Sequence, residues 1–420
     1  MKKEKKNKPI PKHDNTNKNL VILAALSILA KVVVVVITIG IFHSFIDTFD
    51  LNFYYGYTTT MAQGKIPYLD IEMEYPPLIF VPILLSLIPQ ALLGIQGAGA
   101  FGLVFQILMI LSDIGIVVCV YYIGLKVWGN EHSAMLAGIL YILSFSAAYF
   151  AITKYDAFPT MLFMAALAYT FYQKEVKGYI AATLGVLAKI FPMAAFPFLI
   201  LFNAKSTSIK REIISAATVI IPVAVLFIPV LIFRPEAIRI FIPLRMNFDY
   251  YANTLTYTIH SWLHGMFGLG LTIETVSAVM YLVMIGTLLA LVYTAYKLPD
   301  KSPKLLLKLI LCAIVISVVA ARVRSPQYIV WYTPLICLLA VDDIKKIVLL
   351  FVTQLLAFIE FPLAFGAFYT ATTYTAPIMT SGWQAALILF TAMYAITFIC
   401  IWFVVEPREL YRKLRGVMSD

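Results

Sequence analysis

The sequence predicts an all-α polytopic membrane protein with about twelve transmembrane helices, two of them half-length. Of its 420 residues, 61% are hydrophobic and only 13% are charged. Apolar runs close to the length of a membrane span recur along the chain, whereas no polar block is long enough to fold alone. We therefore expect one membrane domain over residues 19–405, between basic cytoplasmic tails at 1–18 and 406–420.

The expected spans follow from the apolar runs taken in order. The first begins after a lysine-rich tail and stays as a signal anchor, because it lacks a small-residue cleavage site. The run at 179–202 is interrupted at Lys189-Ile-Phe-Pro192 and counts as two half-length helices. With these spans, most lysines and arginines fall on one side of the membrane, which the positive-inside rule identifies as the cytoplasm. Both termini are therefore expected in the cytoplasm. The membrane is expected to be the plasma membrane. The other spans are expected at 19–42, 101–125, 133–151, 157–172, 213–233, 272–296, 305–321, 328–341, 344–366 and 383–405.

The first loop outside the cytoplasm, expected at 43–100, holds a dense acidic and aromatic stretch. Its run at 77–93 is interrupted by Pro82 and Pro89 and is short for a span, so we expect an interfacial helix there. An outward carboxylate at the end of a span, as at Asp47 or Asp50, suits a general base that takes a proton from a hydroxyl. The alternative is a solvated interface charge or a helix cap. The carboxylates of this stretch are Asp47, Asp50, Asp70, Glu72 and Glu74.

The ionisable residues that we single out within or at the ends of the expected spans are Asp113, Lys154, Asp156, Lys189 and Glu360. A charge at membrane depth costs a few kcal/mol, so each is a candidate for function. Structural pairing is the alternative, since Lys154 and Asp156 could neutralise each other and Asp113 could bond to a neighbouring helix. Lys189 differs because it lies at a helix break, which favours a role facing a phosphate.

Two further segments, both expected on the extracytoplasmic side, could bind an anion, and the first of them contains two arginines. Arg322 and Arg324 precede a helix that starts at a proline, with Gln327 and Tyr328 in its first turn. Guanidinium groups and the N–H groups of a helix start bind phosphate well. Snorkelling of the arginines to lipid headgroups is the alternative.

The loop at 234–264 mixes arginine and histidine with aromatic residues, as at Arg245 and His260. This composition suits stacking on a carbohydrate and binding of phosphate, although an interfacial aromatic belt has the same composition. His260 and His264 have the spacing of a metal-binding pair, but no third ligand is evident.

Several short motifs resemble, in the same order, those of GT-C glycosyltransferases, and among them the polyprenol-phosphate-mannose-dependent mannosyltransferases of bacteria and archaea. The resemblance covers most of the chain up to about residue 335. Each motif alone is weak, and their order is what is specific. The motifs are Asp50-x-x-x-Tyr54-Tyr55, Gly64-x-x-Pro67-Tyr68, Glu74-Tyr75-Pro76-Pro77-Leu78, Ser112-Asp113, Tyr155-Asp156, Lys189-Ile-Phe-Pro192 and Ser325-Pro326-Gln327-Tyr328-x-x-Trp331.

The resemblance implies a GT-C-like helix bundle and an inverting transfer of a hexose, mannose by family default. The donor would be a polyprenyl-phosphate sugar, and the acceptor a hydroxyl of a lipid-linked or glycan molecule on the extracytoplasmic face. It further implies that no metal or other cofactor and no nucleic acid takes part. Asp50 would be the base, with Asp47 competing for that role.

The resemblance also distributes roles among the other motif residues. Lys189, Arg322 and the Gln327–Tyr328 corner would lie near the donor phosphate, in a donor site to which Arg324, Arg245 and His260 are added. Arg324 departs from the expected aromatic or small residue, and the acceptor side has no matching motif. The residues that would shape the loop under the donor lipid are Tyr55, Glu74, Tyr75, Pro76 and Pro77.

Two other functions are compatible with the residues. The helix break at Lys189 and the buried charges also occur in transporters or flippases for a lipid-linked or small anionic substrate, although no paired halves are evident. A receptor or assembly subunit could bind a glycolipid through the same acidic loop without any chemistry.

Overall fold

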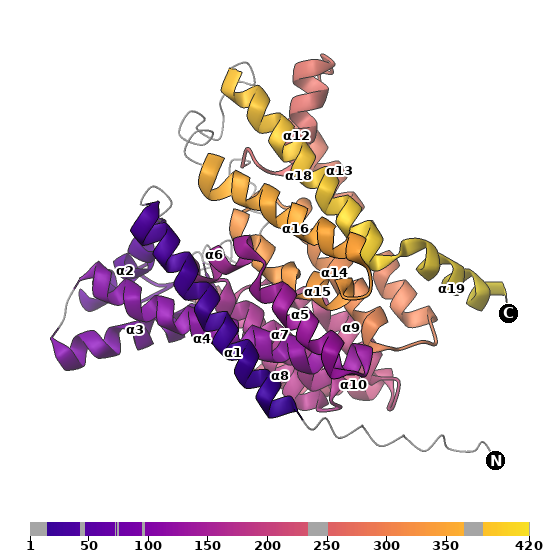
Figure 1. Cartoon of the computed structure of the whole chain (residues 1–420), viewed down its shortest axis with the longest axis horizontal. Helices are drawn as coiled ribbons and strands as arrows, with labels where there is room; N and C mark the ends of the chain where they lie inside the picture. Colours follow the sequence, from indigo (N-terminus) through magenta and orange to yellow (C-terminus); the bar gives the residue numbers. More distant parts are fainter. Residues whose placement is uncertain are drawn as a thin grey trace.

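The computed structural model describes residues 15–42, 47–71, 73, 75–94, 97–233, 251–364 and 381–419. These residues form helices joined by short turns, with a single isolated bridge between Pro67 and Ile71 and no β-strand within the described ranges (Figure 1). The expected all-α class is confirmed. The α-helices are α1 (Thr16–Val35), α2 (Phe49–Ala62), α3 (Phe80–Leu93), α4 (Ala98–Trp128), α5 (Glu131–Ile142), α6 (Phe145–Thr153), α7 (Ala157–Phe171), α8 (Glu175–Ala188), α9 (Phe196–Asn203), α10 (Ile209–Phe233), α12 (Leu255–His260), α13 (Ile273–Lys297), α14 (Pro303–Val319), α15 (Ile329–Ala340), α16 (Ile344–Phe358), α18 (Ser381–Val405) and α19 (Pro407–Ser419).

The membrane class is also confirmed, since several helices of the described ranges can cross a membrane by length and composition. Five do so alone, and α5 with α6, which meet at a bend of 62°, make up a sixth candidate. Other expected crossings correspond to shorter apolar helices, so the total of about twelve stays a prediction. The five helices are Thr16–Thr38, Ala98–Trp128, Ile273–Lys297, Ile344–Ala364 and Gln384–Val405, and the shorter ones are Pro77–Ile88, Ala157–Phe171, Phe191–Asn203 and Pro326–Ala340.

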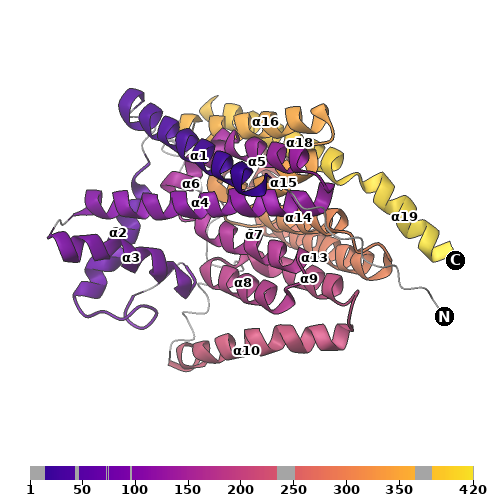
Figure 2. The ribbon, with the colours of Figure 1, turned by 60° about the horizontal axis from the view of Figure 1, so that its bottom comes forward.

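Two helices organise the core. The long helix α4 packs against α1, α3, α5 and α7 and runs across the molecule in Figure 2. Every residue of α15 is buried, because α15 lies among α5, α6, α14 and α16. A helix that is apolar on all sides can lie in lipid or inside a bundle; the contacts of α15 place it inside the bundle, with one end at the candidate site described below.

The expected first loop is largely helical. α2 and α3 lie together at one end of the molecule (Figures 1 and 2). The acidic stretch is thus not an open loop, as the sequence had led us to expect: Asp50 lies in the first turn of α2, and Asp47 Oδ1 accepts a hydrogen bond from Phe49 N at 3.1 Å. A carboxylate ahead of a helix stabilises the free N–H groups of its first turn. The expected helix after Pro77 is present as a 3₁₀ turn (Pro77–Ile79) that continues into α3.

The expected break at Lys189 is confirmed. α8 ends at Ala188, Lys189 is extended (φ −157°, ψ 141°), and a 3₁₀ turn (Phe191–Ala195) leads into α9. Pro192 lies in this turn, where a missing N–H is tolerated. The break lets the Lys189 side chain leave the helix surface and point toward the start of α15.

Candidate active site

A cluster of two carboxylates and one lysine joins the start of α2 to the end of α6. Lys154 Nζ lies 2.5 Å from Asp47 Oδ2 and 3.0 Å from Asp50 Oδ2. All three side chains are nearly buried, with exposed fractions of 7% for Lys154, 11% for Asp47 and 13% for Asp50. The expected alternative, in which Lys154 neutralises Asp156, is wrong because α2 brings two closer carboxylates to the ammonium group.

Burial and pairing act on this cluster in opposite directions. Burial raises the pKa of Asp50 above its ordinary value, although Lys154 partly offsets this. Burial also lowers the pKa of Lys154, but the nearby Asp50 and Asp47 carboxylates outweigh it and raise that pKa. Lys154 thus favours the ionised form of Asp50, which is the form that a general base requires.

A second cluster forms where α7 begins, α8 ends and α15 begins. Lys189 Nζ lies 2.6 Å from Asp156 Oδ1, and Trp331 Nε1 donates to the same oxygen at 2.5 Å. The Lys189 ammonium also lies over the rings of Tyr75, Tyr328 and Trp331, at 5.9, 5.2 and 5.1 Å from their centroids. A lysine held in this way is charged, desolvated and close to the helix start that the sequence had marked as an anion site.

Three tyrosines connect the two clusters. The rings of Tyr54, Tyr75 and Tyr155 pack edge to face, with centroids 5.7 to 6.4 Å apart. Tyr155 stands in the chain between Lys154 and Asp156, so a single three-residue junction between α6 and α7 supplies a charged group to each cluster. We name the whole set, Asp47, Asp50, Lys154, Asp156, Lys189, Tyr54, Tyr75, Tyr155, Tyr328 and Trp331, the carboxylate–lysine site.

The other loop-shaping residues lie around this site. Tyr55 faces away, with its ring 5.5 Å from that of Phe101. Pro76 is buried and Pro77 begins the 3₁₀ turn. These two prolines directly follow Tyr75 in the chain and hold its backbone in place. Glu74 and Arg245, which the sequence had also nominated, lie outside the described residues.

Arg322 and Arg324, which precede α15, lie in two different environments. Arg324 is buried and forms a two-pronged ion pair with Glu360, at 2.7 and 3.0 Å, while Asn253 Nδ2 donates to Glu360 at 2.8 Å. This pairing engages Arg324 with protein groups and accounts for both buried charges structurally. Arg322 is half-buried, and its carbonyl accepts a hydrogen bond from Tyr251 N at 3.1 Å. Gln327 is buried in the first turn before α15.

The Arg324–Glu360 pair is linked to the first cluster through one aromatic ring. Phe361 follows Glu360 in the chain, and Lys154 Nζ lies 5.7 Å from its ring centroid. The sequence showed no signal for Phe361, and none for Tyr54, Tyr155 or Trp331 beyond their place in the motifs, because 14% of the chain is aromatic.

Asp113 belongs to a separate buried network. Its carboxylate pairs with Lys31 at 2.7 Å and accepts hydrogen bonds from Ser27 at 3.0 Å and Tyr141 at 2.9 Å. These partners lie on α1 and α5, so this network joins three helices. The structure thus shows the bonding to neighbouring helices that the sequence had left open for Asp113.

His260 contacts residues that are not part of the carboxylate–lysine site. Its ring stacks on that of His264, with centroids 5.4 Å apart, and lies 6.5 Å from the ring of Tyr257. Among the described residues, no group of three or more His, Cys, Asp or Glu side chains is gathered closely enough to hold a metal ion.

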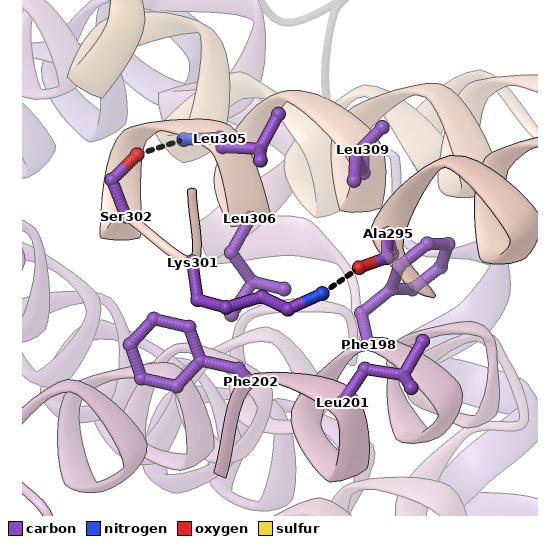
Figure 3. Close-up of a pocket in the computed structure, with 9 residues that line it drawn as sticks. All are labelled: Phe198, Leu201, Phe202, Ala295, Lys301, Ser302, Leu305, Leu306 and Leu309. Atoms are coloured by element: carbon purple, nitrogen blue, oxygen red, sulfur yellow. Dashed lines mark hydrogen bonds between the residues drawn. The ribbon is translucent and has the colours of Figure 1, made fainter. Parts of the chain in front are cut away.

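An apolar pocket lies among α9, α13 and α14, away from the carboxylate–lysine site (Figure 3). Lys301 crosses it and donates to the carbonyl oxygen of Ala295 near the end of α13. Lysine side chains commonly stabilise the last carbonyls of a helix in this way. None of the nominated residues lines this pocket, which therefore does not extend the candidate site.

The comparisons with known proteins agree with the expected class. The sequence profile of glycosyltransferase family 87 matches residues 75–321. No match to this chain was found among the curated proteins.

Among solved structures, ArnT from Cupriavidus metallidurans in the apo state is similar, with 15% identity over 96% of this chain and 74% of that chain and a TM-score of 0.50. ArnT bound to undecaprenyl phosphate gives 16% identity over 96% and 74%, with a TM-score of 0.49. The Archaeoglobus fulgidus oligosaccharyltransferase tethered with an acceptor peptide gives 13% identity over 94% and 55%, with a TM-score of 0.45. At such identities the likeness to ArnT concerns the fold alone.

Proposed function

The chain belongs to glycosyltransferase family 87 and has a GT-C-type fold, and from this premise we propose that it is an inverting hexosyltransferase that uses a polyprenyl-phosphate donor. The sugar proposed first is mannose, and the acceptor is a hydroxyl of a lipid-linked or glycan molecule. The reaction would take place on the extracytoplasmic face of the cell membrane, with both termini in the cytoplasm.

One observation carries this proposal: a buried carboxylate pair and a desolvated lysine lie in one continuous site. Asp50 and Lys189 come from distant parts of the chain, and the packed rings of Tyr54, Tyr75 and Tyr155 lie between them, with only Tyr75 partly exposed. The proposed reaction needs a base at one end and a cation at the other. The undecaprenyl phosphate bound by ArnT supports a lipid phosphate as the donor's leaving group.

In the proposed reaction, the acceptor oxygen forms a bond to the anomeric carbon while the bond from that carbon to the phosphate oxygen breaks. The acceptor's proton passes to Asp50, and the electron pair of the broken bond stays on the polyprenyl phosphate. Lys189 would stabilise the phosphate as its charge develops. No metal takes part in this proposal.

Asp50 is favoured over Asp47 as the base. Asp47 already accepts a hydrogen bond from Phe49 N, so part of its carboxylate holds the start of α2. Asp50 has no such backbone donor among the described residues. Arg322, Gln327 and Tyr328 would contribute to the donor side, with Arg324 acting through Glu360 instead of on the donor.

Transport stays a weaker alternative. Its main support was the helix break at Lys189, and the pairing of Lys189 with Asp156 provides another reason for that break. The family match adds nothing in favour of transport or of a binding-only role.

Transfer from radiolabelled polyprenyl-phosphate mannose to membrane extracts tests the proposal. Asp50→Asn keeps the size of the side chain and removes the base, so we expect loss of transfer by about 10²- to 10⁴-fold with donor binding retained. Asp70→Asn is the matched control, because Asp70 is exposed and, among the described residues, its side chain bonds to the backbone of its own turn, accepting from Ile66 N at 2.8 Å.

Full transfer by Asp50→Asn would refute the assignment of Asp50 as the base. If Asp47→Asn loses transfer and Asp50→Asn does not, Asp47 is the base instead. If wild-type protein moves the labelled lipid across vesicles without consuming it, the transport alternative is correct instead.

A further inference from the structure

The basic C-terminal segment is a helix with a strongly two-sided surface. α19 begins directly after α18 and projects from the end of the bundle (Figures 1 and 2). Arg408, Arg412 and Arg415 follow at spacings of four and three residues, so they share one face of the helix. All three are exposed, and none forms an ion pair with the residues that the structure describes.

The opposite face of α19 is apolar, with Leu410 and Leu414 packed on the core of the bundle. Tyr411, which lies next to the arginine face, is 64% exposed. A short helix with opposed apolar and arginine faces is typical of helices that lie in a membrane interface.

The start of α19 is held firmly in place. Glu406, the residue between α18 and α19, has a positive φ of 56° that changes the direction of the chain. Its carboxylate pairs with Lys308 at 2.5 Å and with Lys346 at 2.9 Å, and both lysines are buried. The direction in which α19 leaves the bundle is thus determined by ion pairs to α14 and α16.

Aromatic side chains mark the level at which α19 begins. Trp402 is 52% exposed and Phe403 is also exposed, in the last turn of the candidate span Gln384–Val405. Tryptophan near the end of a span prefers the headgroup level of the bilayer. A helix that starts five residues after Trp402 therefore starts at the surface of the same leaflet.

We propose that α19 lies in the plane of the membrane and binds anionic phospholipid headgroups through Arg408, Arg412 and Arg415. The exposed Tyr411 ring would enter the boundary between headgroups and acyl chains while the three guanidinium groups contact lipid phosphates. A lipid surface is favoured over a protein or a nucleic acid, because the arginine face adjoins this exposed ring and α19 directly follows a candidate membrane span whose last turn exposes Trp402 and Phe403. This site lies at the opposite end of α15 from Trp331 and is independent of the proposed glycosyl transfer.

Hydrogen exchange of the full-length protein in lipid nanodiscs tests this site directly. We expect the amides of 407–419 to exchange at least tenfold more slowly in discs that contain phosphatidylglycerol than in discs of phosphatidylcholine alone. Each arginine near an anionic surface contributes roughly fivefold to the affinity, or about a hundredfold for three. The variant Arg408→Gln/Arg412→Gln/Arg415→Gln should lose the difference between the two kinds of disc, and high salt should reduce it in the wild type.

The matched control removes the same charge elsewhere. Lys174→Gln/Lys177→Gln/Lys205→Gln alters three exposed lysines that do not belong to α19, and it should keep the wild-type response. Equal exchange in both kinds of disc, or an unchanged response in the arginine variant, would overturn the proposal. Slowing by inorganic phosphate alone in phosphatidylcholine discs would also overturn it, because a free anion would then suffice.

Discussion

Replacing Lys154 by methionine is the sharpest perturbation of the proposed chemistry. Lys154 is the shared partner of Asp47 and Asp50, at 2.5 and 3.0 Å, and its side chain is 7% exposed. Removing one partner of a buried ion pair costs about 3–5 kcal/mol, because the remaining charge is left without compensation. Here two carboxylates lose their cation together.

The effect on catalysis has a definite sign. Burial already raises the pKa of Asp50, and Lys154 is the main group that opposes this rise. Activity of an ionised base is lost as the pH falls through its pKa. The Lys154→Met change should therefore move the acidic limb of the pH–rate profile to higher pH and raise the fraction of protonated Asp50 near neutral pH.

At neutral pH we expect kcat/KM to fall by about 10²- to 10⁴-fold, which is the contribution of a positioned general base, because Asp50 loses the cation that favours its ionised form. The assay is transfer from radiolabelled polyprenyl-phosphate mannose over a range of pH. Lys154→Arg keeps the charge and should retain the wild-type acidic limb. Lys126→Met removes a partly exposed lysine that lies over the Tyr172 ring and serves as the control. An unshifted acidic limb in Lys154→Met would refute the reasoning.

Three further predictions concern the other charged groups. Trp331→Phe keeps the stacked ring but removes the donor to Asp156, so thermal unfolding should show a loss of about 1.5–3 kcal/mol; no change in melting temperature would contradict the observed bond. Glu360→Gln should destabilise the protein by about 3–5 kcal/mol, and the paired change Arg324→Met/Glu360→Leu should recover most of this in the same unfolding assay, whereas additive losses would count against a mutual pair. Burial raises the pKa of Glu406, but two lysines outweigh burial and lower this pKa from 4.5 to about 2. The ionised carboxylate should therefore stabilise the fold fully above pH 4.5, and this stabilisation should disappear as the pH falls toward 2. Melting curves of Glu406→Gln should match the wild type at low pH and lie about 2–4 °C lower near neutral pH, and a constant offset at every pH would rule this linkage out.

Local features of the structure could be predicted from the sequence. The helix break at Lys189 was visible because Pro192 lacks an N–H group. The helix after Pro77 was visible because proline is favoured in the first turn of a helix. The class of the protein followed from apolar composition, which determines how each segment partitions into a membrane.

The helical state of the acidic stretch was not visible in the same way. The segment of α2 has no clear apolar periodicity, and its tyrosines and threonines have no strong helix propensity. It becomes helical because Leu51, Tyr54 and Tyr57 bury against the bundle. This packing also turns Tyr54, and not Tyr55, toward the candidate site.

The sequence alone determined the membrane class, the order of the motifs and the candidate base Asp50. Only the tertiary structure decided which charges pair: Lys154 with Asp47 and Asp50, Lys189 with Asp156, and Arg324 with Glu360. The physical reason is that a buried charge requires a close partner, whichever segment supplies it. Lys154 and Asp156 are two residues apart in the chain, yet helix packing brings each a nearer partner from another part of the protein.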